Sequence, residues 1–71
     1  MTSRELGQRI RERRKLLNIN QSDVARLASC SKPSVVAAEA GKPTLRLDKL
    51  LAILQVLGLT IRLEDAGASK E

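Results

Sequence analysis

The 71-residue chain contains no phenylalanine, tyrosine, tryptophan or histidine, and it has a single cysteine. One cysteine cannot form an internal disulfide, and the usual zinc ligands are too few for a metal site. Without histidine a nucleophile lacks its commonest activating base, so we expect no enzyme activity and no cofactor. A core made only of Leu, Ile, Val and Ala favours helices over a β-sandwich.

Long hydrophobic runs are also missing. No apolar stretch approaches the roughly 20 residues that cross a bilayer, and the N-terminus shows no signal-peptide pattern. We therefore expect no contact with a membrane and a location in the reducing cytoplasm. The length suits one small domain with a thin core, which a second copy would help to cover.

Positive charge is concentrated in the first part of the chain. The net charge is +5; residues 1–42 hold nine Lys and Arg against four Asp and Glu, whereas residues 43–71 hold four of each. A basic cluster of this kind is typical of proteins that bind a polyanion such as nucleic acid. On charge alone, a solvated helix face is an equal alternative.

Apolar spacing and capping residues predict four helices, at about residues 3–17, 21–28, 33–40 and 46–57. Asn20 is a good N-cap for the second helix. Asn18 and Gly41 suit the left-handed backbone that ends many helices. Pro33 suits a first turn, where its missing N–H has no intrahelical partner. These helices together predict a mostly α domain.

The periodicity changes after the fourth helix. Three apolar residues alternate there with polar ones, which predicts a strand: Leu59, Ile61 and Leu63. The chain offers no second strand to satisfy its backbone, so the simplest partner is the same strand in another copy. The expected division is a helical domain, a dimerising strand and a flexible tail, at residues 1–58, 59–64 and 65–71.

The stretch QSDVARLASCSKPSVVAAEAG, residues 21–41, has small or apolar residues at its fourth, fifth, eighth, tenth, fifteenth and eighteenth positions. This pattern resembles the helix-turn-helix of DNA-binding repressors. Glycine is usual at the ninth position of that unit, because it permits a positive φ in the turn. Ser29 occupies the position here, so the fit allows a turn that is one residue longer or differently shaped.

The resemblance extends over roughly residues 5–58, which are similar to the four-helix, lambda-repressor-like fold of xenobiotic-response-element and Cro-type repressors. It implies a homodimer that binds double-stranded operator DNA. The ending LGLTIRL resembles the antitoxins of Hip-type toxin–antitoxin pairs. That second resemblance implies dimerisation through a C-terminal strand, autoregulation of an operon and a HipA-like serine/threonine-kinase toxin as partner.

The resemblance also assigns candidate site residues. The third helix would enter the major groove with its N-terminal end first, and five residues would then face base edges: Ser31, Lys32, Pro33, Val36 and Ala37. Four residues are candidates for phosphate contacts: Arg13, Gln21, Ser34 and Lys42. Three residues would form the dimer interface: Leu59, Ile61 and Leu63.

Several of these residues have alternative roles. Lys32 is the best candidate for a guanine contact, with a phosphate contact or free solvation as its alternative. Val36 and Ala37 either touch thymine methyls, so that DNA shape contributes to preference, or pack inward. Ser34 either donates to a phosphate or caps its own helix. Glu39 can pair with an arginine of the first helix.

Three functions remain open on the sequence. The chain is a repressor that also restrains a kinase toxin, an ordinary transcriptional regulator without such a partner, or a helical adaptor that binds protein. The adaptor would not retain DNA at moderate salt, and a toxin gene beside this one would favour the first function over the second.

Overall fold

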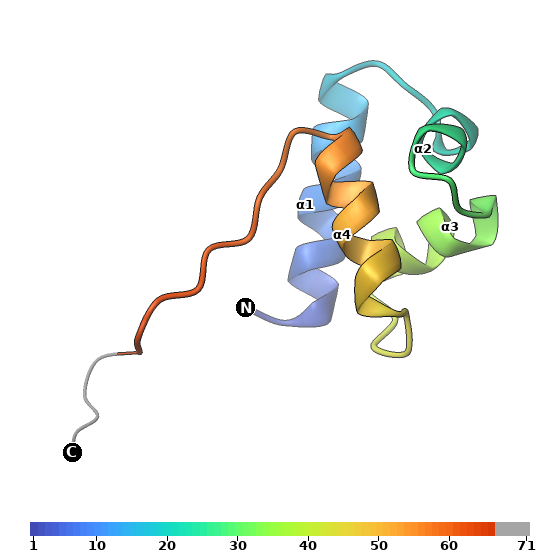
Figure 1. Ribbon diagram of the computed structural model, residues 1–71. Helices are drawn as coiled ribbons and strands as arrows, with labels where there is room; N and C mark the ends of the chain where they lie inside the picture. The colour runs from blue at the N-terminus through green and yellow to red at the C-terminus, as the bar shows by residue number, and fades with distance from the viewer. Residues whose placement is uncertain (67–71) are drawn as a thin grey trace.

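The computed structural model describes residues 1–66. Its four helices are α1 (Ser3–Leu16), α2 (Gln21–Leu27), α3 (Lys32–Ala40) and α4 (Leu47–Val56). Each predicted helix is confirmed, with its ends shifted by no more than one residue. α3 packs against both α1 and α2, and α4 packs on α2 and α3, which gives the arrangement seen in Figure 1.

All four helices contribute to one apolar core. Its buried members are Ile10, Val24, Ala25, Val35, Ala38, Ile53, Leu54 and Leu57. Full burial of an aliphatic side chain of this size contributes about 1.5–3 kcal/mol relative to exposure. The core therefore fixes α2 and α3 as a unit on the other two helices.

The crossing of α1 and α3 depends on a glycine. A Cβ atom at Gly7 would lie 2.5 Å from the carbonyl oxygen of Glu39 and 2.7 Å from that of Ala38. Contacts this short are not tolerated, so only glycine allows the two backbones to approach. Gly41 then ends α3 with a φ of 73°, as predicted, and donates its N–H to the Ala38 carbonyl at 3.1 Å.

A capping box begins α1. The Thr2 hydroxyl accepts the Glu5 backbone N–H at 3.1 Å, and the Glu5 carboxylate accepts the Thr2 N–H at 2.7 Å. The second bond is the main reason why the pKa of Glu5 lies below its ordinary value. The contribution of this bond to stability is fully present at pH values above the ordinary pKa of glutamate, and it is lost as the pH falls through the lowered pKa.

The turn between α2 and α3 keeps the geometry for which glycine is usual. Ser29 adopts a φ of 55°, and Asn18 after α1 has a φ of 64°. The left-handed prediction for Asn18 is thus confirmed. Ser29 shows that this turn is not differently shaped: a non-glycine residue occupies the left-handed region at a cost of roughly 1–2 kcal/mol.

Replacing Ser29 with glycine is therefore expected to stabilise the domain by about 0.5–1 kcal/mol. The relieved backbone strain exceeds the extra freedom that glycine gives to the unfolded chain. Chemical denaturation followed by circular dichroism measures the change. Ser22→Gly, at an exposed position in the first turn of α2, is the control and should destabilise the domain by up to about 1 kcal/mol. A loss of stability in Ser29→Gly would contradict the strain argument.

The segment after α4 is extended but forms no strand within residues 1–66. The Leu59 N–H still closes the helix by donating to the Leu54 carbonyl at 2.9 Å, and the chain then continues as an extended segment (Figure 1). A strand needs a hydrogen-bonded partner, and one chain has no second strand to supply it. Most of the predicted tail, residues 67–71, lies outside the described residues.

Candidate nucleic-acid interface

α2, the turn and α3 form a compact unit that leaves one face of α3 exposed. Val24 and Ala25 of α2 and Val35 and Ala38 of α3 point into the core. The Cys30 N–H donates to the Ala25 carbonyl at 2.9 Å, which closes the turn between the helices. These contacts hold α3 against the body along a single side.

The opposite side of α3 carries the residues predicted to face base edges. Ser31, Lys32 and Pro33 are exposed at its N-terminal end. Val36 is 44% exposed and Ala37 is half-buried. The alternative that Val36 packs inward is therefore wrong, and the outward face combines one cation with a patch of small apolar groups.

The two serines at the start of α3 satisfy each other. The Ser31 hydroxyl accepts the Ser34 backbone N–H at 3.3 Å, and the two hydroxyl oxygens lie 3.0 Å apart. Ser34 thus takes part in the local cap, which was the alternative to a phosphate contact. One hydroxyl must donate to the other, so one O–H of the pair is left to donate elsewhere.

A partly buried ionic network connects the first three helices. Arg14 binds the carboxylate of Glu39 with two nitrogens, at 2.5 and 3.1 Å, and donates to the Ile19 carbonyl at 3.0 Å. Gln21 donates its amide N–H to the same carboxylate at 3.1 Å. The predicted pairing of Glu39 with an arginine of the first helix is confirmed, and the hydrogen bond to Glu39 raises the pKa of Arg14 above its usual value.

Gln21 is consequently less free than the sequence indicated. Its side chain is partly buried and its amide nitrogen is bound to Glu39. The amide nitrogen carries two N–H donors, and the bond to Glu39 uses one of them. The network holds the side chain in place at the start of α2, and the predicted phosphate contact stays a prediction.

Arg13 has a partner within the chain, and its predicted phosphate contact stays a prediction. Its Nε donates to the Leu57 carbonyl at 2.9 Å, where α4 ends. The side chain thus caps α4, because a cation favours the carbonyl end of a helix. Arg11 is the neighbouring arginine that lines the hollow formed with Arg14, Gln21, Glu39 and Ala40.

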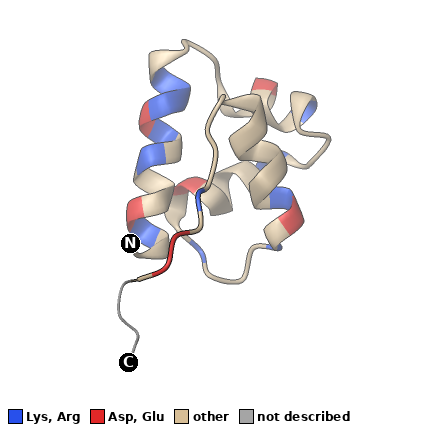
Figure 2. Ribbon diagram, turned by 60° about the vertical axis from the view of Figure 1, so that its left-hand side comes forward, with Lys and Arg blue, Asp and Glu red and all other residues tan. Residues whose placement is uncertain are grey.

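Further cations lie along α1 and just beyond α3. Lys42 is exposed immediately after Gly41, and its N–H donates to the Ala37 carbonyl at 3.0 Å. Figure 2 shows that Lys and Arg occupy successive turns of α1. The sequence placed these charges in the first part of the chain, but it did not show that Arg11 shares a hollow with α2 and α3.

A helix-turn-helix family model matches residues 10–63, and these include both α2 and α3. The chain belongs to this Cro/C1-type helix-turn-helix family. It is also 34% identical over 70 residues to a protein described as the uncharacterized HTH-type transcriptional regulator y4mF of Sinorhizobium fredii (strain NBRC 101917 / NGR234). That match covers 99% of this chain and 92% of the relative.

Membership of the helix-turn-helix family confirms that the protein is not an enzyme. Within residues 1–66, no three His, Cys, Asp or Glu side chains gather closely enough to hold a metal ion. None of the helices in the described part of the chain is long and apolar enough to span a membrane.

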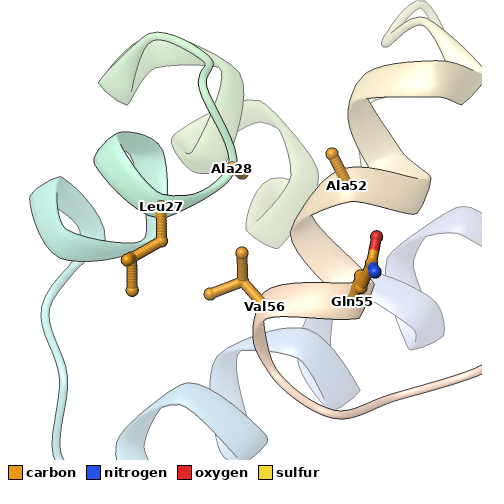
Figure 3. A pocket seen from close by; sticks show the side chains of 5 residues that line it. All are labelled: Leu27, Ala28, Ala52, Gln55 and Val56. Atoms are coloured by element: carbon orange, nitrogen blue, oxygen red, sulfur yellow. The ribbon is translucent and has the colours of Figure 1, made fainter.

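A second hollow lies between α2 and α4. It is lined by Leu27, Ala28, Ala52, Gln55 and Val56 (Figure 3). None of these side chains is charged, so the hollow offers no cation to a phosphate. We assign it no part in the helix-turn-helix interface, and its half-exposed Leu27 serves as a control position below.

Proposed function

We propose that the protein is a homodimeric, cytoplasmic transcriptional repressor that binds a specific DNA sequence through α3. The outward face of α3 is the observation that carries this proposal. Val35 and Ala38 attach the helix to the core, while Lys32, Pro33 and Val36 are left exposed. A helix presented in this way fits the major groove, which admits an α-helix with its side chains.

The residues of α3 divide by the contacts that their chemistry permits. Lys32 donates to the O6 and N7 acceptors of a guanine. Pro33, Val36 and Ala37 have no side-chain hydrogen-bonding group, so they touch thymine methyls or exclude other shapes. The Ser31 hydroxyl faces a base edge as an acceptor for a base amino group. With so few polar groups on the face, part of the sequence preference comes from DNA shape and deformability.

The phosphate contacts come from the rim around α3. We assign them to Lys42, to the free O–H that Ser31 and Ser34 share, and to Arg11, which replaces Arg13 in this role. Gln21 sets the position of the α2 N-terminus against the backbone. These contacts carry no sequence information, but they fix the register of α3 on the duplex.

Arg11→Gln and Arg13→Gln are expected to separate DNA binding from stability. Arg11→Gln should weaken binding to all sequences alike and reduce the slope of log K against log salt by about 0.9, because one phosphate contact is lost. Arg13→Gln should keep that slope and destabilise the domain by about 1 kcal/mol, because the α4 carbonyl loses a charged donor. Salt titrations and denaturation measure both; the reverse pattern would restore the original assignment of Arg13.

Dimerisation supplies the second recognition helix. Residues 59–64 of two copies pair as a two-stranded ribbon, with Leu59, Ile61 and Leu63 on its covered face. The remaining part, residues 1–58, is the DNA-binding domain. Two recognition helices related by a two-fold axis read half-sites about 34–36 Å apart on a near-palindrome.

Selection of binding sites from random duplexes tests the proposed function. The expected product is a near-palindrome with half-sites about one helical turn apart. Lys32→Ala should relax the preference at one base pair of each half-site, where a good contact discriminates by about 1–3 kcal/mol. If random DNA competed as well as every selected site at physiological salt, specific repression would be refuted.

A narrower role as the antitoxin of a kinase toxin rests on the ending LGLTIRL alone. The groove-reading face and the C-terminal strand are on different parts of the chain, so the two activities are compatible. A HipA-like kinase gene beside this one, and a stable complex of the two purified products, would support the role. An unrelated neighbouring gene would favour a regulator without a toxin partner.

A further inference from the structure

The extended C-terminal segment has a free backbone edge. Within the described residues, no backbone group of 60–66 takes part in a hydrogen bond. An extended edge of unpaired N–H and C=O groups is a template for another strand. The segment nevertheless lies beside the domain, because Thr60, Ile61 and Arg62 line an apolar hollow with Met1, Leu6 and Leu54.

Exposure rises along the covered face of the segment. Leu59 is half-buried against the core, Ile61 is 45% exposed and Leu63 is 95% exposed. Within one chain, the almost fully exposed Leu63 buries hardly any apolar surface, so it contributes little to stability there. A symmetric partner that runs in the opposite direction would bring the exposed end of one segment to the packed end of the other.

Symmetry leaves few ways to pair two identical antiparallel segments. In an antiparallel pair, residues directly opposite each other point to the same face of the ribbon. A two-fold axis that passed between two neighbouring residues would therefore put apolar side chains opposite polar ones. An axis at Leu59 or Thr60 would require Leu57 to join the ribbon, but Leu57 is buried at the end of α4. An axis at Glu64 would place two carboxylates directly opposite each other, which is destabilising. Three single-residue axes then remain within the segment: Ile61, Arg62 and Leu63.

The charge and hydrophobicity of the paired side chains indicate which of these three axes is favoured. An axis at Arg62 places two arginines directly opposite each other, which is destabilising. An axis at Leu63 places Ile61 opposite Asp65, a carboxylate. An axis at Ile61 pairs Ile61 with itself and Leu59 with Leu63, and the opposite face then pairs Thr60 with Arg62.

We propose that Ile61 lies on the two-fold axis of the dimer ribbon, so that Leu63 of each copy covers Leu59 of the other. This register rests on the proposed dimer and defines it further. The interface is then continuous with the core through Leu59, and the apolar hollow around Leu6 and Leu54 accepts the second copy. Arg62 and Glu64 remain on the solvent side, where a guanidinium nitrogen of Arg62 lies 3.8 Å from a carboxylate oxygen of Glu64.

A cysteine scan of the full chain tests the register. Cys30→Ala removes the native thiol, and single cysteines then replace Leu59, Thr60, Ile61, Arg62 or Leu63 in separate variants. Only the residue on the axis meets its own copy within the roughly 7 Å Cα separation that a disulfide allows. Residues next to the axis are displaced from their copies by a further two residues, or roughly 6.6 Å along the strand. Glutathione-buffered oxidation and non-reducing gels provide the readout.

Ile61→Cys is expected to give most of the disulfide dimer. A mixture of Leu59→Cys and Leu63→Cys proteins should give the mixed dimer. Preferential cross-linking of Arg62→Cys or Leu63→Cys would overturn the register while leaving the ribbon. A dimer in sedimentation with no cross-link at any position would overturn the ribbon, and a monomer would overturn the dimer itself. Gel shifts with the selected DNA judge DNA binding separately.

A matched pair of variants keeps the inference testable without oxidation. Leu63→Ser should raise the dimer dissociation constant at least tenfold, whereas Glu64→Ser on the solvent face should change it less than twofold. Leu63 is almost fully exposed in one chain, so its loss cannot act through the folding of the protomer. Equal effects from the two substitutions would contradict the assigned faces.

Discussion

Replacing Val36 with glutamate is expected to lower the affinity for the selected DNA at least about 100-fold, which corresponds to about 2.7 kcal/mol. Val36 is exposed in the middle of the outward face of α3. A carboxylate placed there meets the negative field of the DNA backbone and has only cytosine amino groups as suitable donors in the groove. Like-charge juxtaposition across an interface costs several kcal/mol. Fluorescence anisotropy with a labelled duplex measures the loss.

Leu27→Glu is the charge-matched control. Leu27 is 55% exposed in the hollow between α2 and α4, away from the outward face of α3. The Leu27→Glu substitution adds the same negative charge as Val36→Glu, so a general electrostatic effect on DNA binding would appear in both variants. A loss in Val36→Glu that did not exceed the loss in Leu27→Glu would contradict the placement of α3 in the groove.

Replacing Glu39 with alanine is expected to destabilise the domain by about 3 kcal/mol. Only 5% of the Glu39 side chain and 13% of the Arg14 side chain is exposed, so solvent screens the pair little. Its removal leaves the partly buried Arg14 guanidinium without a counterion and Gln21 without an acceptor. Breaking one side of a buried pair costs about 3–5 kcal/mol, and the partial exposure of Arg14 places this pair at the lower end. For a small domain with a total stability near the low end of about 5–15 kcal/mol, this loss is a large fraction. Urea denaturation measures it.

A double substitution distinguishes the cost of an unpaired charge from the value of the pair. Arg14→Met combined with Glu39→Leu removes both charges and keeps apolar volume, so much of the lost stability should return. The double variant should still bind DNA more weakly, because Gln21 has lost the carboxylate that positions it. If the double variant were no more stable than Glu39→Ala, the penalty would come from lost packing and not from an isolated charge.

The sequence predicted the four helices well because their signals are local. Asn20 accepts a hydrogen bond from the Asp23 N–H, Gly41 has a positive φ and Pro33 lies in the first turn of α3. Each of these features depends on neighbours within four residues. The apolar positions of α2 and α3 were equally readable, since Val24, Val35 and Ala38 are all buried.

The arginines were harder to assign because their partners are distant in sequence. Arg13 and Arg14 are adjacent, yet one caps α4 and the other binds Glu39 of α3. Adjacent residues of a helix point to different sides, and which element each arginine reaches follows from how α1 packs on the other helices. No local pattern reports a crossing angle, so the sequence indicated that basic residues matter without showing which.

The predicted C-terminal strand was the hardest element to establish from the sequence. Its alternating pattern is clear in the sequence, but the described residues of one chain supply no strand to pair with it, so the strand stays a prediction. The described residues show an extended segment with an unpaired edge, as the proposed dimer requires. Its register is consequently an inference from symmetry and charge.

The missing side chain at Gly7 has a consequence for how this protein can diversify. The depth to which α3 projects beyond the rest of the fold is set by direct backbone contact with α1, independently of the residues on the outer side of α3. Substitutions at Lys32 or Val36 can therefore alter the preferred operator without moving the scaffold, whereas one methyl group at position 7 would shift every reading residue together.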